Sequence, residues 1–194
     1  MRQPPRPVRA QLAAESANVF VCKSMSKAYA LSGLRAAYMV GPRPEIAKLA
    51  KLGPPWAVSL PAQVAAVAAL SSGDYYNAQY RRTAELREQL AAELRDRCGI
   101  VAFPSVTNFL LCVLPAQTSD AADIVRRART YEVFLRTGEE IHLSLGQRTI
   151  RIAVINKGPE MNRKIIEVLS TLVLSSFYDR VGNESEPSPQ AVTG

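Results

Sequence analysis

Hydrophobic and polar positions follow two different periods along this chain of 194 residues. Over residues 75–97, leucines recur at every fourth position with charged residues between them, which predicts one long amphipathic helix that ends at Gly99. Shorter runs rich in β-branched and aromatic residues predict strands. The expected strands are residues 18–23, 34–40, 108–114, 133–136, 141–145 and 149–155. The other expected helices are residues 44–52, 61–71, 120–131 and a final one that opens at Gly158-Pro159. The pattern indicates a mixed α/β protein.

Three of these helices have a definable apolar face. The expected core-facing residues are Leu86, Leu90 and Leu94 in the long helix, Val64, Val67 and Ala68 in the helix before it, and Met161, Ile165, Val168 and Leu172 in the last one.

The elements fall into an α/β part and a smaller α+β part, joined by the long helix. The expected boundaries are 1–16, poorly ordered; 17–73, the first part; 74–98, the linking helix; 99–179, the second part; and 180–194, a disordered tail rich in Gly, Ser and Pro. The first part has only two strands. Two strands make a poor independent sheet, because their faces and edges need partners.

The composition fits a globular protein, with 47% hydrophobic and 21% charged residues. No apolar run is long enough for a membrane span, and the N-terminal residues do not resemble a secretory signal. Cys22, Cys98 and Cys112 match no zinc or redox spacing, so we expect free thiols, no metal and a cytoplasmic location. Cys22 and Cys112 lie in apolar runs and are expected in the core. His142, the only histidine, receives no role.

The net charge of +7 leaves two interpretations open. A basic surface can bind nucleic acid. The arginines are, however, interleaved with acids, as in RRTAELREQLAAELRDR, and few aromatic residues lie between them. This pattern favours solvated helix faces over a nucleic-acid surface. Part of the excess charge can also serve anionic ligands.

The segment SMSKAYALSGLRAAYMVG, residues 24–41, carries the clearest chemistry. The hydroxyls of Ser24 and Ser26 and the guanidinium of Arg35 can grip a phosphate. The amine of Lys27, expected in a loop, can condense with an aldehyde to form an imine. Together these groups suggest pyridoxal 5'-phosphate as a cofactor. The plainer alternative is that Lys27 is a solvated lysine in a serine-rich loop.

This segment resembles the cofactor-lysine signature of class I/II aminotransferases of fold type I, and the histidinol-phosphate aminotransferases in particular. PPWAVSLPAQVAAVAAL, PSVTNFLL, VFLRTG and TIRIAV resemble later segments of that family in the same order, from about residue 17 to 172. Four motifs in family order are more specific than one. The resemblance implies the C-terminal part of the large α/β domain, followed by the small α+β domain.

The resemblance also implies roles for individual residues. Lys27 would hold the cofactor covalently and later move a proton, while Ser24, Ser26 and Arg35 would anchor its phosphate. The implied substrate-binding residues are Arg151 for the α-carboxylate, Arg136 for the distal group and Asn108 near the carboxylate. Arg151 alternates with two isoleucines, so it faces away from their side of the strand. The plainer alternative is an ordinary exposed arginine. The implied substrates are amino acids and 2-oxo acids, and the implied assembly is a homodimer, without nucleic acid or membrane partners.

The sequence departs from the family at two places near these motifs. Ala37 stands where glycine is frequent, and Ile155-Asn156-Lys157 replaces the usual Gly-Thr after TIRIAV. The family also carries a large N-terminal part, with an Asp that pairs with the pyridine nitrogen, that finds no counterpart in residues 1–17. Two hypotheses therefore remain: an aminotransferase polypeptide that corresponds to a C-terminal portion, or a catalytically inactive remnant that acts at most as an interaction or fragment-complementation module. We expect weak or no activity from the isolated chain.

Overall fold

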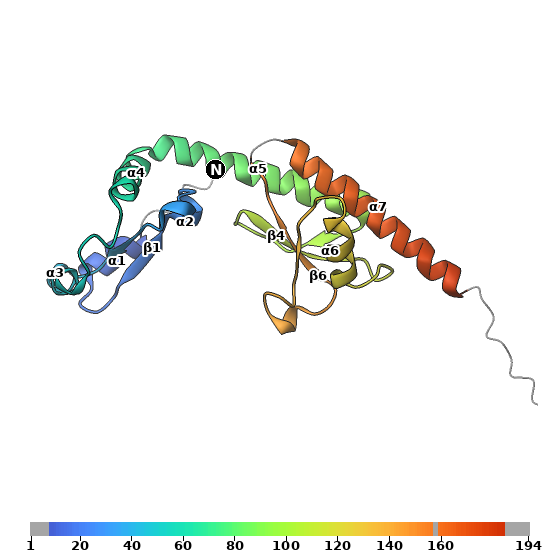
Figure 1. The fold of residues 1–194 in the computed structure, drawn as a ribbon, viewed down its shortest axis with the longest axis horizontal. Coiled ribbons are helices and arrows are strands. Elements are labelled where there is room, and N and C mark those ends of the chain that lie inside the picture. The colour runs from blue at the N-terminus through green and yellow to red at the C-terminus, as the bar shows by residue number, and fades with distance from the viewer. Residues whose placement is uncertain (1–7, 157–158, 185–194) are drawn as a thin grey trace, which may run out of the picture. The chain divides into compact units, whose positions relative to one another are not determined.

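The computed structural model describes residues 8–156 and 159–184, and they form two units. The division falls between Ala78 and Gln79, inside helix α5 (Gly73–Cys98). Figure 1 shows the order of the elements along the chain. Each unit is described by itself.

The first unit is built around a short antiparallel hairpin. Its elements are α1 (Val8–Glu15), β1 (Val21–Ser24), α2 (Met25–Ala28), a 3₁₀ turn (Ser32–Leu34), β2 (Ala37–Val40), α3 (Arg43–Leu52) and α4 (Leu60–Ser71). Strands β1 and β2 pair from Val21 opposite Val40 to Ser24 opposite Ala37. The buried core of this unit is small and consists mostly of methyl side chains; it contains Met25, Ala36, Ala62 and Ala69, with Tyr29, Leu31, Leu34, Tyr38, Val58, Ala66 and Tyr76 packed against them.

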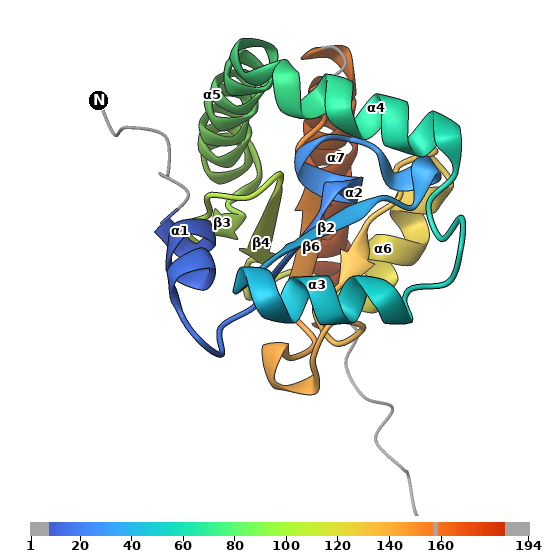
Figure 2. The ribbon, with the colours of Figure 1, turned by 90° about the vertical axis from the view of Figure 1, so that its left-hand side faces the viewer.

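The second unit is a four-stranded sheet covered on one face by helices. Its elements after α5 are β3 (Val101–Ala102), β4 (Phe109–Val113), α6 (Ala121–Arg129), β5 (Arg136–Thr137), a 3₁₀ turn (Leu143–Leu145), β6 (Thr149–Ala153) and α7 (Pro159–Glu184). The strand order is β3-β4-β6-β5, and all neighbours are antiparallel. Helices α5, α6 and α7 share one core with the buried face of the sheet, as both views show (Figures 1 and 2). This leaves the other face of β4, β5 and β6 available for a binding site.

Helix α5 confirms the prediction that the regularly spaced leucines form the core-facing side of one long helix. Leu86, Leu90 and Leu94 are all buried in the core of the second unit. The helix ends where Gly99 adopts a left-handed conformation with φ of +63°, and the amide of Ile100 donates to the carbonyl of Leu94 at 3.1 Å. The bond satisfies a backbone carbonyl that the last helical turn would otherwise leave without a partner.

Four expectations for the first unit were wrong in detail. Residues 8–15, inside the segment expected to be poorly ordered, form α1, which the alanine-rich sequence favours. The strand expected over 34–40 is shorter, because a 3₁₀ turn precedes it. The apolar face of α4 was misassigned: Val64 and Val67 are 63% and 66% exposed, while Ala62 and Ala69 face the core. Cys22, expected in the core, is exposed on the hairpin, whereas Cys112 is buried as expected.

Expectations for the second unit also needed correction. The strand expected over residues 133–136 begins only at Arg136. Residues 141–145 form no strand, because His142 caps a 3₁₀ turn through a 3.2 Å bond from the amide of Ser144 to its Nδ1 atom. Met161 is exposed, although the other three residues expected on its face of α7 are buried. Helix α7 continues to Glu184, past residue 180, where the tail was expected to begin; residues 185–194 of that tail and residues 1–7 lie outside the described residues.

Two classes of feature are not found in the part of the chain that the structure describes. None of its helices is long and apolar enough to cross a membrane. Within the same residues, no group of His, Cys, Asp and Glu side chains gathers as a metal site would require.

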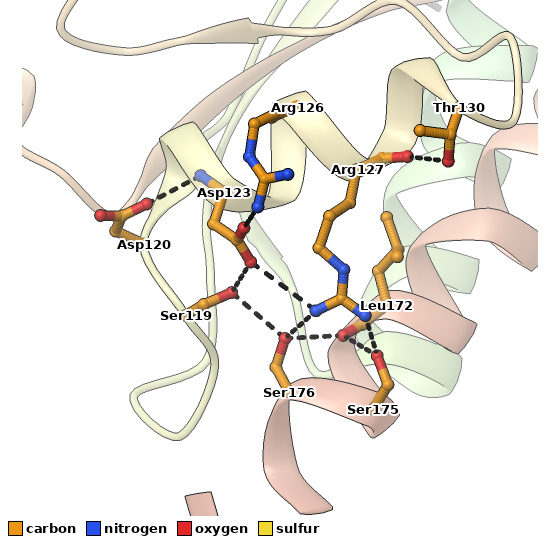
Figure 3. A network of polar contacts seen from close by, with 9 residues as sticks. All are labelled: Ser119, Asp120, Asp123, Arg126, Arg127, Thr130, Leu172, Ser175 and Ser176. Carbon is orange, nitrogen blue, oxygen red and sulfur yellow. Dashed lines mark hydrogen bonds and ion pairs between the residues drawn. The ribbon is translucent and has the colours of Figure 1, made fainter. Parts of the chain in front are cut away.

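A polar network holds α6 against α7 (Figure 3). Asp120 caps α6, since its carboxylate accepts a 2.8 Å bond from the amide of Asp123. The Asp123 carboxylate in turn accepts from Ser119 at 2.9 Å and pairs with Arg126. Arg127 reaches across to α7, where its guanidinium donates to Ser175 at 2.7 Å. The network therefore anchors the helix that precedes β5.

We expect Asp123→Asn to weaken the second unit in a pH-dependent way. Burial would by itself raise the pKa of Asp123, but the hydrogen bond from Ser119 and the charge of Arg126 outweigh it, and the pKa lies below its ordinary value. The stabilisation is therefore present above about pH 4, the unfolded value, and is lost as the pH falls through the lowered pKa. Urea unfolding should show a loss of about 1 kcal/mol at pH 7, and a smaller difference from the wild type below pH 4.

The matched control is Asp96→Asn, which removes the carboxylate of an exposed ion pair with Arg95. Such pairs contribute little, so this variant should unfold like the wild type. A loss of the same size in both variants, or a loss for Asp123→Asn that does not shrink at low pH, would show that the network does not stabilise α6.

Candidate active site

The site residues expected from the sequence fall into two groups, one in each unit. Ser24, Ser26, Lys27 and Arg35 lie in the first unit, and Asn108, Arg136 and Arg151 lie in the second. Each group has a local geometry of its own.

Lys27 lies on α2, a single helical turn, and not in the expected loop. The sequence favours this turn because Ser24 caps it: the Ser24 hydroxyl accepts a 3.3 Å bond from the amide of Ser26. Met25 anchors the turn in the core, and its amide donates to the carbonyl of Ala36 at 3.1 Å. Lys27, two positions after the buried Met25, is exposed.

A pair of tyrosines fixes the other end of this turn. Tyr29 ends α2, and its ring meets that of Tyr76 edge to face with 4.9 Å between centroids. The Tyr76 hydroxyl donates to the carbonyl of Tyr29 at 3.3 Å. Lys27 is therefore an exposed amine on a turn that is held at both ends.

Arg35 comes to the same end of the hairpin from the second strand. The pairing of Ser24 with Ala37 and the bond from Met25 to Ala36 place the start of α2 beside the residues just before β2. Arg35 has a left-handed backbone with φ of 53°, and its guanidinium donates to the carbonyl of Ser32 at 3.0 Å. The left-handed residue lets the chain pass from the 3₁₀ turn into β2.

The donor set at this end of the hairpin fits a phosphorylated aldehyde. Ser24 and Arg35 are exposed and Ser26 is half-buried, so two hydroxyls and a guanidinium are available to phosphate oxygens. The amine of Lys27 is one turn or less away along α2. Ala37, where a glycine was expected to be more favourable, has an exposed side chain on β2.

In the second unit, Arg151 lies on the sheet face opposite the helices. Ile150 and Ile152 on either side of it are buried in the core, which confirms the alternation expected for β6. Its guanidinium carbon lies 4.2 Å from the ring centroid of Phe109 on the neighbouring strand. This stacking orients the planar group while its N–H donors stay available at its edge.

Arg136 is the direct neighbour of Arg151 across the β5–β6 pair. Both arginines line an open cavity of about 410 Å³. Arg129 at the end of α6 and Glu140, whose carboxylate lies 3.9 Å from the Nε atom of Arg136, line it as well. Three guanidiniums and one carboxylate leave a positive excess, which suits an anionic ligand.

Asn108 lies at the start of β4, beside the end of β6. Its carbonyl accepts a 2.9 Å bond from the amide of Val154, and its side chain is exposed. Asn108 and Arg151 therefore lie on adjacent strands, on either side of the Phe109–Ala153 pair.

The sequence reasoning missed Arg129, Phe109 and Glu140. Arg129 is one of three arginines at the end of α6, and no local signal separates it from its neighbours. Phe109 lies inside the Asn-Phe motif, but its contact with Arg151 depends on the register of β4 and β6. The pairing of strands reveals Phe109, while Arg129 and Glu140 come to the cavity from α6 and from the turn after β5.

The sequence matches the family described as aminotransferase class I and II over residues 2–169. The chain belongs to the class I and II aminotransferases. This confirms the resemblance of the lysine segment and of the motifs after it. Members of this family of transferases use pyridoxal phosphate.

Histidinol-phosphate aminotransferase 1 of Caulobacter vibrioides is 32% identical to this aminotransferase chain over 162 residues, which are 82% of the chain and 43% of that relative. The chain thus spans less than half the length of that curated relative. The histidinol-phosphate aminotransferase of Clostridium acetobutylicum has a similar structure, with a TM-score of 0.70 and 22% identity over 80% of this chain and 46% of that one.

A third similar structure is the histidinol-phosphate aminotransferase of Sinorhizobium meliloti in complex with pyridoxal-5'-phosphate. Its TM-score is 0.68, with 24% identity over 88% of this chain and 44% of that one. The mixed α/β fold therefore corresponds to part of the fold type I aminotransferase fold, as the sequence predicted.

Proposed function

We propose that this chain is the lysine-bearing portion of a pyridoxal-phosphate-dependent aminotransferase, acting between an amino acid, or an amino-acid-like phosphate, and a 2-oxo acid. The observation that supports it best is the exposed Lys27 on a fixed turn, beside two serines and across the hairpin from Arg35. When bound, the cofactor supplies the electron sink for the reaction.

In this proposal the residues of the first unit hold the cofactor. Ser24, Ser26 and Arg35 bind the phosphate, where charge-assisted hydrogen bonds are strongest. The Lys27 amine would hold the cofactor through its aldehyde carbon, with loss of water, and as a free amine would carry a proton to or from the substrate Cα atom. An exposed, flexible lysine on a rigid turn suits both tasks, because the amine can move while its backbone stays in place.

In the second unit, Arg151 binds the substrate α-carboxylate through its planar fork of donors. Arg136 binds the distal group of the substrate, and Asn108 lies near the carboxylate. The cavity that Arg151 and Arg136 line, with Arg129 as a third cation, supports a substrate that carries a second anionic group. We further propose that the enzyme is cytoplasmic and acts as a homodimer in amino-acid biosynthesis.

A second candidate function is an inactive interaction or complementation module. It is favoured by the first unit, which has only a two-stranded sheet and exposes large apolar side chains: Leu52 at the end of α3 is 81% exposed, and Trp56 in the loop after α3 is 92% exposed. Such surfaces typically need a partner. A second polypeptide that completes the sheet would then supply the remaining cofactor contacts.

The test is to titrate the purified chain with pyridoxal phosphate, reduce it with borohydride and map the labelled peptide. The proposal expects the visible absorbance of a lysine-bound cofactor and a label on Lys27. A stoichiometric label spread over several lysines would contradict it. A label on Lys27 without amino transfer to any 2-oxo acid would favour the second candidate.

A further inference from the structure

The segment that follows β6 is one of the two places where the sequence was found to depart from the family motifs, and it is held from two sides. The buried Asn162 of α7 binds the backbone of Ile155 twice: its Oδ1 accepts from the Ile155 amide at 3.2 Å, and its Nδ2 donates to the Ile155 carbonyl at 3.1 Å. The side chain thus replaces two backbone partners at the point where the strand has ended.

Asn156 connects the same segment to helix α5. Its half-buried Nδ2 atom lies 3.0 Å from the Oε1 atom of Gln79, 3.3 Å from the hydroxyl of Thr83 and 3.5 Å from the carbonyl of Gln79. The two Gln79 oxygens can only accept, and the Thr83 hydroxyl accepts here because it donates its own proton to the Gln79 carbonyl at 2.8 Å. The amide end of Asn156, and not its carbonyl, therefore makes this contact.

Arg87, one turn further along α5, makes a second connection. Its Nη1 atom donates to the carbonyl of Thr107 at 3.1 Å, directly before Asn108. The residue is buried, and its Nε atom has no hydrogen-bond partner among the described residues. Its Nη2 atom pairs with the carboxylate of Glu88 at 3.0 Å, so the buried guanidinium is held between a neighbour on α5 and the carbonyl of Thr107.

These contacts come from one face of α5 and reach one end of the sheet. Gln79, Thr83 and Arg87 are four residues apart and therefore lie on the same side of the helix. They hold the end of β6 through Asn156 and the start of β4 through Thr107. These two strand ends are paired, and between them lies the stack of Arg151 on Phe109.

We propose that Asn156 and Arg87 are positioning residues, which set the orientation of Arg151 and Asn108 from helix α5. Neither is a catalytic residue. Asn156 fixes the end of the strand that carries Arg151, and Arg87 fixes the start of the strand that carries Phe109. The inference deepens the proposed function and rests on it, because Arg151 must receive a substrate carboxylate for the orientation to matter.

Asn156→Asp tests this role with a nearly isosteric change. The variant replaces the donor by a carboxylate oxygen, which cannot donate to the two oxygens of Gln79, so these two contacts become repulsive. Two readouts are measured by NMR on the full chain. One is the ring-current shift of the Arg151 guanidinium protons over Phe109; the other is the affinity of 2-oxoglutarate, read from the Arg151 Nε–H signal and assigned with Arg151→Lys.

The expected result is loss of the ring-current shift and a fall in affinity of at least about tenfold, within the hundredfold that a misplacement of about 1 Å can cost. Thr83→Val keeps the shape of its side chain and should produce a smaller change in both readouts. It serves as the test if Asn156→Asp fails to fold. Gln117→Glu, at the exposed loop after β4, adds the same charge and should change neither readout.

The ring-current shift decides the inference without any ligand. An unchanged shift and affinity in a folded Asn156→Asp or Thr83→Val variant would overturn it, and a loss of thermal stability alone would assign these residues to the fold. If the wild type shows the stack but binds no 2-oxoglutarate, the substrate role of Arg151 fails, while the shift still tests the positioning.

Discussion

Replacing Lys27 with alanine is expected to abolish covalent attachment of pyridoxal phosphate. After borohydride reduction, the wild type should carry the cofactor on the peptide that contains residue 27, and the variant should carry none at substoichiometric cofactor. The reason is geometric: Lys27 is exposed on a turn fixed by Met25, next to Ser24 and Ser26. Phosphate binding raises the local concentration of the aldehyde at this one amine.

Lys23→Ala is the matched control. Lys23 is exposed on β1, four residues before Lys27, but it precedes the Ser24 cap and pairs with Tyr38 in the hairpin. Its loss should leave the label in place. Equal labelling of the wild type and Lys27→Ala would disprove the assignment of the cofactor lysine. An equal partial loss of label in Lys23→Ala and Lys27→Ala would show that both lysines of this hairpin react.

The same experiment can separate the phosphate grip from the covalent step. Because Ser24 also caps α2 through the amide of Ser26, a change at Ser24 would disturb the turn as well as the anchor. The Arg35 guanidinium donates to the carbonyl of Ser32 and plays no part in the cap of α2. Weaker labelling after a change at Arg35, with Lys27 intact, would therefore report on the phosphate itself.

Much of the second unit could be predicted from its periodicity. The leucines of α5, the alternation around Arg151 and the helix expected from residue 120 are local signals whose partners lie in the same element or on one face of it. Such patterns predict the elements correctly because a helix or strand with one apolar face is stabilised by burial of that whole face.

The misassigned elements share a different cause. Val64 and Val67 of α4 are more hydrophobic than Ala62 and Ala69, yet the smaller residues face the core, because the small core of this unit admits helices only at close approach. Residues 141–145 contain β-branched and aliphatic residues, but the contact of His142 with Ser144 forms a turn instead. In the helix, tertiary packing outweighs hydrophobicity; in the turn, a local side-chain cap outweighs strand propensity.

The candidate site also has a part that the sequence predicts and a part that it does not. Lys27 and its serines are neighbours in sequence, so the motif alone indicates their chemistry. The neighbours of Arg151 come from three strands and a helix, and they depend on a register that no local pattern contains. The hydrogen bond from Asn156 to α5 joins residues that are more than seventy positions apart in the sequence. For this reason the sequence alone assigned no role to Asn156, which lies where the family motif has Gly-Thr.

Replacing Arg151 with glutamine is expected to weaken the binding of 2-oxoglutarate by about thirtyfold or more. Hydrogen bonds to charged groups contribute about 1.5–3 kcal/mol each, and about 1.4 kcal/mol corresponds to a tenfold change. Glutamine keeps much of the side-chain length but loses both the charge and the fork of donors. Isothermal titration or NMR titration of the full chain measures the change.

Two control variants separate the effect of the Arg151 guanidinium from that of net charge and of a positive charge at position 151. Arg163→Gln removes an exposed arginine of α7 and should leave the affinity unchanged, which excludes a general effect of net charge. Arg151→Lys keeps the charge but not the planar group that stacks on Phe109. If lysine restores full affinity, the site needs only a positive charge. If it does not, the planar fork held over the ring is what recognises the carboxylate, and the register of β4 and β6 becomes part of substrate recognition.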